Sequence, residues 1–179
     1  PHSVQEIAQA FVPVYEILKC EDMQLVLEPD PGVNTPNGAT VAALLREINS
    51  ERIGALWDPG NILFDTAGEI PYPDGYEAVR PWLKHVHLKD SVRENGQARA
   101  VPFGTGQVDM EGQLRRLVKD GYNGWVSLEP HYRLDRVLDE ATLRLPAGSS
   151  FSEGGLAAGT DTMSRLTEKM KRWGLTPAT

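Results

Sequence analysis

Apolar and polar residues alternate in blocks along the chain, and these blocks predict strands that alternate with helices. Four short apolar runs are typical of buried strands. They cover residues 24–28, 53–57, 85–88 and 125–128. A strand that recurs after each helix favours an α/β fold with a parallel sheet and right-handed crossovers. The pattern alone leaves open whether this sheet is closed into a barrel or doubly wound.

Apolar residues at helical spacing predict the segments between and after the strands. Helices are expected over residues 3–19, 39–49, 75–83, 111–120 and 133–144, and a last helix carries Met163, Leu166, Met170 and Trp173 on one face. Pro13 is expected to kink or split the first helix. Long loops are expected over residues 89–109 and, rich in Gly and Ser, over residues 147–160.

An ionisable residue stands at the end of each predicted strand. These residues are Glu28, Asp58, His87 and Glu129. Loops at the carboxyl ends of parallel strands build the active sites of α/β proteins, so the four side chains are expected to converge. Three carboxylates in a partly dry pocket would repel one another, and a divalent cation removes that penalty. This oxygen-rich set with one nitrogen suits Mn²⁺, Mg²⁺ or Co²⁺, and Zn²⁺ is a less favoured option.

Two details of these strand ends bear on chemistry. Leu27-Glu28-Pro29 recurs as Leu128-Glu129-Pro130, so the two glutamates can face each other across the metal, one removing a proton from a substrate carbon and the other returning it.

His85 and His87 are both in the third run, and we expect only one of them to point into a barrel, with His85 as a packing residue. Any single strand-end acid is more often a helix cap than a metal ligand.

Composition narrows the partners. The 179 residues carry 25 acidic and 18 basic side chains, a net charge of −7, without a basic stripe that would follow nucleic-acid phosphates. No apolar run approaches the roughly 20 residues that span a bilayer. The single cysteine, Cys20, cannot form an internal disulfide, which fits a reducing compartment. A cytoplasmic protein that binds neither nucleic acid nor membrane is therefore expected.

Five segments occur in an order that resembles the xylose isomerase-like barrel superfamily. They are LVLEP, LWDPGN, HVHLKD, FGTGQVD and WVSLEP, and together they span residues 24–130. The resemblance implies a partial (β/α)8 TIM barrel holding about the last four βα units. It also implies one domain over residues 1–179, shortened at its N-terminus, whose residues 146–179 form a Gly/Ser-rich loop and a C-terminal helix. An open sheet edge predicts pairing with another copy as a homo-oligomer, or low stability alone.

The same resemblance implies a function. Glu28, Asp58, His87 and Glu129 would hold the metal, Glu28 and Glu129 would act as acid and base, and Arg93, Asn61 and Asn34 would contact a small sugar or polyol. The implied activity is that of a divalent-metal-dependent sugar isomerase or epimerase that abstracts a proton and forms an enediolate.

Departures from the family pattern keep alternatives open. Ketose epimerases often carry His and Glu where this chain has Asn61 and Asn34, which weakens the case for a ketose 3-epimerase. An inosose dehydratase-like lyase is the alternative enzyme, and a non-catalytic metal- or sugar-binding barrel fragment is the alternative of another class. Ala98 and Ala100 stand where the apurinic endonuclease branch has two further metal ligands, which disfavours a trinuclear zinc nuclease.

Overall fold

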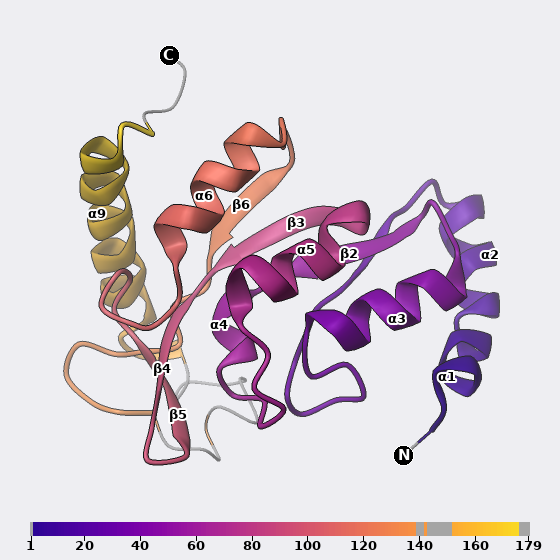
Figure 1. Ribbon diagram of the computed structural model, residues 1–179, viewed down its shortest axis with the longest axis horizontal. Helices are drawn as coiled ribbons and strands as arrows, with labels where there is room; N and C mark the ends of the chain where they lie inside the picture. The colour runs from indigo at the N-terminus through magenta and orange to yellow at the C-terminus, as the bar shows by residue number, and fades with distance from the viewer. Residues whose placement is uncertain (1, 139–141, 143–151, 176–179) are drawn as a thin grey trace.

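A parallel sheet forms the centre of the computed structural model, which describes residues 2–138, 142 and 152–175 (Figure 1). Its strands are β1 (Leu25–Leu27), β2 (Ile53–Trp57), β3 (Leu83–Leu88) and β6 (Trp125–Leu128), in the order β1-β2-β3-β6. Every neighbouring pair is parallel. The predicted alternation of strands and helices is confirmed, although β3 begins two residues before the predicted start.

The helices between the strands lie along one face of the sheet, as Figure 1 shows for α3, α5 and α6. The helical segments are α1 (Val4–Ala10), α2 (Val12–Cys20), α3 (Gly38–Ile48), α4 (Pro59–Ile62), a wide turn (Pro71–Gly75), α5 (Tyr76–Val79), a 3₁₀ turn (Arg80–Trp82), α6 (Met110–Lys119) and α9 (Gly155–Trp173). The predicted helix over residues 3–19 is split at Phe11, and Pro13 lies in the first turn of α2, where its missing N–H costs no helical hydrogen bond.

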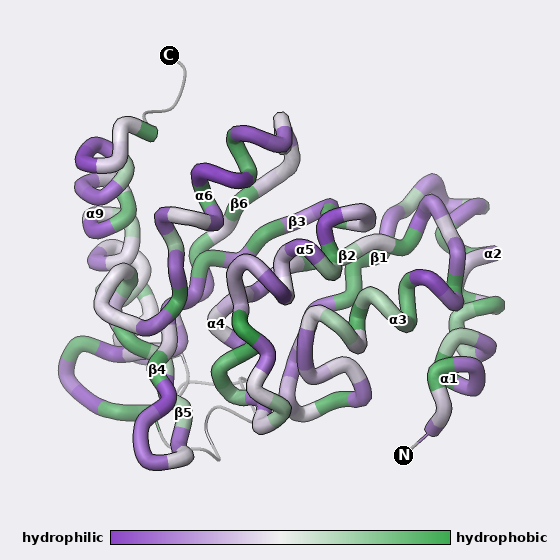
Figure 2. Tube along the Cα trace, viewed as in Figure 1, coloured by the Kyte–Doolittle hydropathy of each residue, from purple (hydrophilic) through white to green (hydrophobic). Residues whose placement is uncertain are grey.

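The core lies between the sheet and these helices. Alternate residues of β2, namely Ile53, Ala55 and Trp57, are almost fully buried together with Val86 and Leu88 of β3. They pack against apolar residues of the helices, which are Val41, Leu45, Tyr76, Val79, Leu114 and Leu117. Figure 2 shows the corresponding apolar stretches along the strands and on the inner sides of the helices. The opposite face of the sheet is thereby left for the strand-end side chains.

One predicted loop contains regular structure. Residues 89–109 include the antiparallel strands β4 (Asp90–Glu94) and β5 (Gln97–Val101), so the expectation of a continuous loop is wrong. Asn95 and Gly96 form the turn, with φ of 51° and 80°, and this left-handed geometry is the one that the pair Asn-Gly favours in two-residue hairpins. The hairpin extends away from the four-stranded sheet (Figure 1).

The C-terminal predictions need correction as well. Residues 133–138 are not helical, and the predicted helix 133–144 otherwise falls mostly outside the described residues. Helix α9 begins at Gly155, inside the predicted loop 147–160, of which residues 147–151 are not described. Its most buried residues are Ala158 and Thr162, whereas Met163 is 53% exposed. Leu166 and Trp173 are partly buried against the core, so this part of the predicted apolar face is confirmed, whereas Met163 departs from it.

Both outer strands of the sheet lack a partner on one side among the described residues, because β1 pairs only with β2 and β6 only with β3. At the β6 edge Trp125 is 81% exposed and Val126 is 41% exposed. Closed barrels have no such edges. No described helix combines the length and apolar character needed to cross a membrane.

Candidate metal centre

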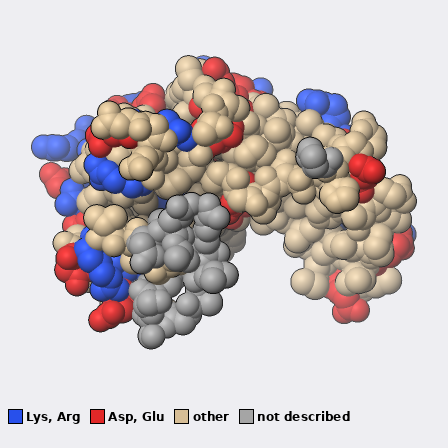
Figure 3. Space-filling view, turned by 90° about the horizontal axis from the view of Figure 1, so that it is seen from below, with Lys and Arg blue, Asp and Glu red and all other residues tan. Residues whose placement is uncertain are grey.

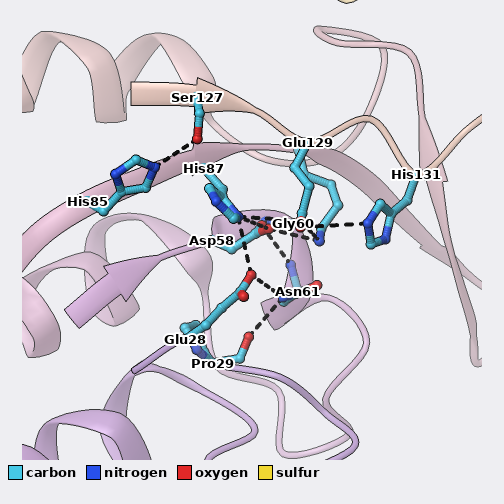
Figure 4. A network of polar contacts seen from close by, with 11 residues as sticks. Glu28, Pro29, Asp58, Gly60, Asn61, His85, His87, Ser127, Glu129 and His131 are labelled. Carbon is cyan, nitrogen blue, oxygen red and sulfur yellow. Dashed lines mark hydrogen bonds and ion pairs between the residues drawn. The ribbon is translucent and has the colours of Figure 1, made fainter. Parts of the chain in front are cut away.

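Four strand-end side chains meet on the face of the sheet opposite the core helices (Figure 4). Glu28 follows β1, Asp58 follows β2, His87 lies near the end of β3 and Glu129 follows β6. Each offers a ligand atom, and these atoms all lie within 4.8 Å of one another. The structure therefore brings together the four residues that the sequence singled out, from segments about 100 residues apart.

Two buried atoms of this cluster make no hydrogen bond of regular geometry, although one of them lies 2.8 Å from the ammonium of Lys89. They are Nδ1 of His87 and Oδ2 of Asp58. Nδ1 of His87 lies 3.4 Å from Oε1 of Glu28, 3.5 Å from Oε2 of Glu129 and 3.8 Å from Oδ2 of Asp58. Buried polar atoms normally have hydrogen-bond partners. Four potential metal-ligand atoms that face one point therefore fit a cation that all of them coordinate.

Asp58 acts both as a helix cap and as a member of this cluster. Its Oδ1 accepts hydrogen bonds from the backbone N–H groups of Gly60, at 2.8 Å, and Asn61, at 3.2 Å, and thereby caps α4. Its Oδ2 stays directed at the cluster. The preceding residue, Trp57, is fully buried and donates its indole N–H to Gln113 at 2.6 Å. Both contacts hold the Asp58 side chain in place.

The end of β1 is held by an amide. Asn61 donates from Nδ2 to Oε1 of Glu28, at 3.1 Å, and to the carbonyl of Pro29, at 2.9 Å. Asn34 is exposed and, with Glu28, lines a groove of about 260 Å³ that also includes Phe11, which lies between α1 and α2. Asn61 thus orients Glu28, while Asn34 stands farther out along the groove. Their roles toward a substrate stay predictions.

The end of β6 is held by a buried ammonium. Nζ of Lys89 lies 2.5 Å from Oε2 of Glu129 and 2.8 Å from Oδ2 of Asp58, and its side chain is only 2% exposed. Burial would raise the pKa of Glu129, but the nearby His87 and Lys89 outweigh it and lower that pKa. Burial would conversely lower the pKa of Lys89, and the Asp58 and Glu129 carboxylates raise it instead. Both groups are therefore charged at neutral pH.

The pKa of His87 reflects the negative charge of the three carboxylates around it. Burial would lower its pKa, yet contacts with Asp58, Glu129 and Glu28 raise the pKa of His87 to about 11. A proton on His87 supplies the positive charge that these carboxylates require. A divalent cation supplies that charge more fully, and it leaves the imidazole neutral and able to coordinate.

His85 shares the inner face with His87, so the expectation that only one of the two points inward is wrong. The ring centroids are 5.3 Å apart and nearly perpendicular, and Nε2 of His85 lies 2.8 Å from Oγ of Ser127 (Figure 4). Residues two apart along a strand lie on the same face, because side chains alternate with a period of two. His85 packs beside the cluster, as expected, without being one of its four members.

Arg93 lies on β4, and its guanidinium donates to three backbone carbonyls. The acceptors are Leu63 at 2.7 Å, Asp65 at 3.0 Å and Gly96 at 3.1 Å. These bonds connect the hairpin to the segment that follows α4. A contact between Arg93 and substrate stays a prediction.

The glycines of the FGTGQVD segment surround a buried carboxylate. Oδ2 of Asp90 accepts from the N–H groups of Gly104, at 2.8 Å, and Gly106, at 2.9 Å. A Cβ at Gly106 would lie 2.0 Å from Oδ1 of Asp90, so only glycine fits there. Asp90 thus fixes this loop after β5.

Lys89 and His131 are the site residues that sequence reasoning undervalued. Lys89 stands two residues after His87 and therefore on the same face. His131 stands two residues after Glu129, and its Nε2 lies 3.7 Å from Oε1 of Glu129. Burial and the nearby Lys89 lower the pKa of His131. An offset of two residues, from His87 to Lys89 and from Glu129 to His131, is the signal in the sequence that points to both.

Basic side chains on the molecular surface are distributed among acidic ones. In the view from below, most Lys and Arg atoms lie on the side that carries α9 and the β4–β5 hairpin, interspersed with Asp and Glu (Figure 3). The described part of this face shows no unbroken basic stripe. This distribution agrees with the expectation of small-molecule rather than nucleic-acid partners, which stays a prediction.

Comparisons with known proteins agree with this fold. A family model described as xylose isomerase-like TIM barrel matches residues 1–151. The structure is similar to that of a xylose isomerase domain protein from Planctomyces limnophilus, with a TM-score of 0.70 and 18% identity. The alignment covers 98% of this chain and 58% of that chain. The predicted partial (β/α)8 barrel is thereby confirmed.

Two curated proteins are similar in sequence. The alpha subunit of 3'-dehydrocarminate deglycosidase from a Microbacterium species is 34% identical over 134 residues, which cover 72% of this chain and 36% of that protein. Inosose dehydratase of Klebsiella pneumoniae is 26% identical over 141 residues, which cover 70% of this chain and 46% of that protein. The chain therefore spans less than half the length of either relative.

Proposed function

The chain belongs to the xylose isomerase-like TIM barrel family, and from this premise we propose that it is a divalent-metal-dependent sugar isomerase or epimerase acting on a keto-sugar or polyol. The observation that carries the proposal is the convergence of three carboxylates and one imidazole, whose ligand atoms all lie within 4.8 Å of one another. Membership of this family supports the general class of enzyme, and the specific reaction is our inference.

Glu28, Asp58, His87 and Glu129 would hold the metal. Three oxygen donors and one nitrogen favour Mn²⁺, Mg²⁺ or Co²⁺ over Zn²⁺. When bound, such an ion polarises a substrate carbonyl and stabilises the negative charge that develops on its oxygen. The Asp58 cap on α4 and the Asn61 contact with Glu28 keep these carboxylates in place before any substrate arrives.

The two glutamates would carry the proton. The carboxylate of Glu28 removes a proton from the carbon next to the substrate carbonyl, and the electron pair of the C–H bond moves to give an enediolate. Glu129, ionised in the resting site, would take a proton from solvent and return it to carbon from the other side, while Glu28 releases its proton to solvent, so that no net proton is gained or lost. An epimerase needs an acid and a base on opposite faces of one carbon, and glutamates at the two outer strands of the described sheet fit that need.

A dehydratase is the second candidate, favoured by the similarity to inosose dehydratase. It would use the same removal of a proton, after which the hydroxyl on the neighbouring carbon leaves and takes up the proton held by the glutamic acid, so that water is released. The other curated relative is named for a dehydro substrate, and a dehydro-sugar and an inosose are both polyols that carry a carbonyl. Asn61 and Asn34, which replace residues typical of ketose epimerases, agree with this alternative.

One experiment tests both the proton abstraction that the two candidate reactions share and the products in which they differ. The full-length protein, supplied with Mn²⁺, is incubated with a panel of ketoses and inososes in deuterated water. Incorporation of deuterium at carbon supports proton abstraction, an epimer or isomer supports the first candidate, and an unsaturated product supports the second. A protein that binds metal and sugar without any exchange would be the non-catalytic binding barrel instead.

Matched variants connect that activity to the site. Glu28→Gln and Glu129→Gln preserve shape and remove a charge, and each is expected to abolish exchange while metal stays bound. Glu168→Gln on α9 makes the same chemical change at a side chain that is 69% exposed, and it is expected to leave exchange unchanged. Equal activity of all three variants would contradict the proposal.

A further inference from the structure

Lys89 is a buried charge beside the centre that neither the proposed metal binding nor the proposed proton transfer uses. Its ammonium lies between two carboxylates from different strands, 2.5 Å from Oε2 of Glu129 and 2.8 Å from Oδ2 of Asp58. These are the oxygens that also face His87. The ammonium therefore bridges two metal-site carboxylates in the way that a second cation would.

The backbone fixes this ammonium in place. The first turn of α4 packs directly onto Lys89, and a Cβ added at Gly60 would lie 2.4 Å from the carbonyl oxygen of Lys89 and 2.9 Å from its Cγ. Gly60 also donates its N–H to Oδ1 of Asp58. One glycine thus brings together the cap on Asp58 and the stem of Lys89, so the ammonium and its carboxylate partner are positioned by the same turn.

The oxygens available to cations are few. Oδ1 of Asp58 is engaged by the two N–H groups of α4, which leaves only Oδ2 for a cation. Oε2 of Glu129 faces both Lys89 and His87, and Oε1 faces His131 at 3.7 Å. A second metal ion bridging Asp58 and Glu129 would need the positions that the ammonium holds.

The balance of charges in the centre also argues against a second metal ion. Glu28, Asp58 and Glu129 carry three negative charges, and Lys89 balances one of them. With His87 neutral, one divalent cation balances the remaining two. Without Lys89 an excess negative charge would remain, and an excess of negative charge attracts a further cation.

We propose that Lys89 restricts the centre to a single divalent ion by occupying the place of a second one. This inference rests on the proposed metal-dependent function. Lys89 is a positioning residue in this role, because it acts through Asp58 and Glu129 and contacts no reacting atom. With Lys89 removed, Asp58 and Glu129, beside His131, become a second set of donors.

The test compares ion stoichiometry among variants, with Mn²⁺ as the probe. Lys89→Gln removes the charge, Lys89→Arg keeps it, and Lys84→Gln makes the neutralising change at an exposed position of β3. Bound Mn²⁺ is counted by elemental analysis after gel filtration, and spin coupling between two ions is sought by electron paramagnetic resonance. We expect one ion per chain in the wild type, Lys89→Arg and Lys84→Gln, and two spin-coupled ions in Lys89→Gln.

The outcomes distinguish a failure of this inference from a failure of the proposed metal-dependent function. A wild type that binds no Mn²⁺ overturns the metal-dependent function. One ion in both the wild type and Lys89→Gln overturns only the role of Lys89, and so do two ions in the wild type. Should Lys89→Gln fail to fold, the smaller neutral variant Lys89→Ser and the wild-type count at saturating Mn²⁺ decide between the same results.

Discussion

The tripeptide Leu-Glu-Pro ends both outer strands of the sheet, yet the two glutamates have different partners. Glu28 at the end of β1 accepts from the neutral amide of Asn61, whereas Glu129 at the end of β6 contacts the buried ammonium of Lys89. Their side chains are almost equally exposed, at 30% and 31%. Burial therefore does not distinguish them, and the charge of the partner does.

This difference assigns different tasks to the two ends. Lys89 lowers the pKa of Glu129 and holds it toward Asp58, which suits a metal ligand that gains a proton only briefly. Glu28 lines the groove next to Asn34, accepts a hydrogen bond from Asn61 and faces His87 without contacting an ammonium, which suits the group that first takes the proton from carbon in the proposed reaction. Identical local sequences thus acquire different surroundings from residues elsewhere in the chain.

The largest expected effect concerns catalysis. Glu28→Gln should lower the rate of deuterium exchange into substrate by about 10³-fold, and Glu129→Gln by about 10²-fold, within the range that general acids and bases contribute. Nuclear magnetic resonance measures the exchange, and metal content is checked in parallel. Losses of equal size, or the larger loss in Glu129→Gln, would remove the distinction between the two ends.

The next effect concerns stability at the β6 end. In the metal-free protein Lys89→Gln leaves Asp58 and Glu129 without the ammonium that lies between them, and breaking such a buried pair costs roughly 3–5 kcal/mol of unfolding free energy. Urea denaturation in the presence of a chelator measures it, with Lys84→Gln as the control. A loss below about 1 kcal/mol would show that the ammonium holds neither carboxylate firmly.

The matching change at the β1 end should cost less. Asn61→Ala removes the hydrogen bonds to the Glu28 carboxylate and the Pro29 carbonyl, and leaving these acceptors unsatisfied costs about 2 kcal/mol. The same urea assay applies. A loss as large as that of Lys89→Gln would mean that a neutral amide and an ammonium hold the two glutamates equally well.

The smallest effect concerns pH and the residue between the two ends. A proton on His87, whose pKa is raised to about 11, competes with the metal, so the apparent affinity for Mn²⁺ should rise about tenfold per pH unit from pH 6 to 8. The same proton stabilises the metal-free fold fully below the ordinary pKa of about 6.5, and this stability is lost as pH rises through about 11.

Isothermal titration calorimetry at several pH values measures the affinity of that metal site. His87→Asn should bind Mn²⁺ more weakly and lose most of the pH dependence. An affinity of the wild type that does not change between pH 6 and 8 would show that His87 carries no proton in the metal-free protein.

Much of the fold follows from local pattern. The four apolar runs became β1, β2, β3 and β6, because a buried parallel strand needs apolar side chains on both faces. The hairpin of β4 and β5 was missed although Asn95-Gly96 indicates a turn, since its strands are mostly polar and do not join the main sheet. The position of the His85 side chain on the same face of the sheet as His87 was also predictable, because side chains along a strand alternate with a period of two.

The sequence by itself determined which residues form the quartet, because a strand-end position and an ionisable side chain are both local properties. Only the tertiary structure decided that Lys89, 40 residues from Glu129, lies between it and Asp58, and that Asn61 lies against Glu28, 33 residues away. Such partners depend on which strands are neighbours, on their register and on the close packing of Gly60 against Lys89. These long-range contacts, rather than the repeated tripeptide, distinguish the two glutamates.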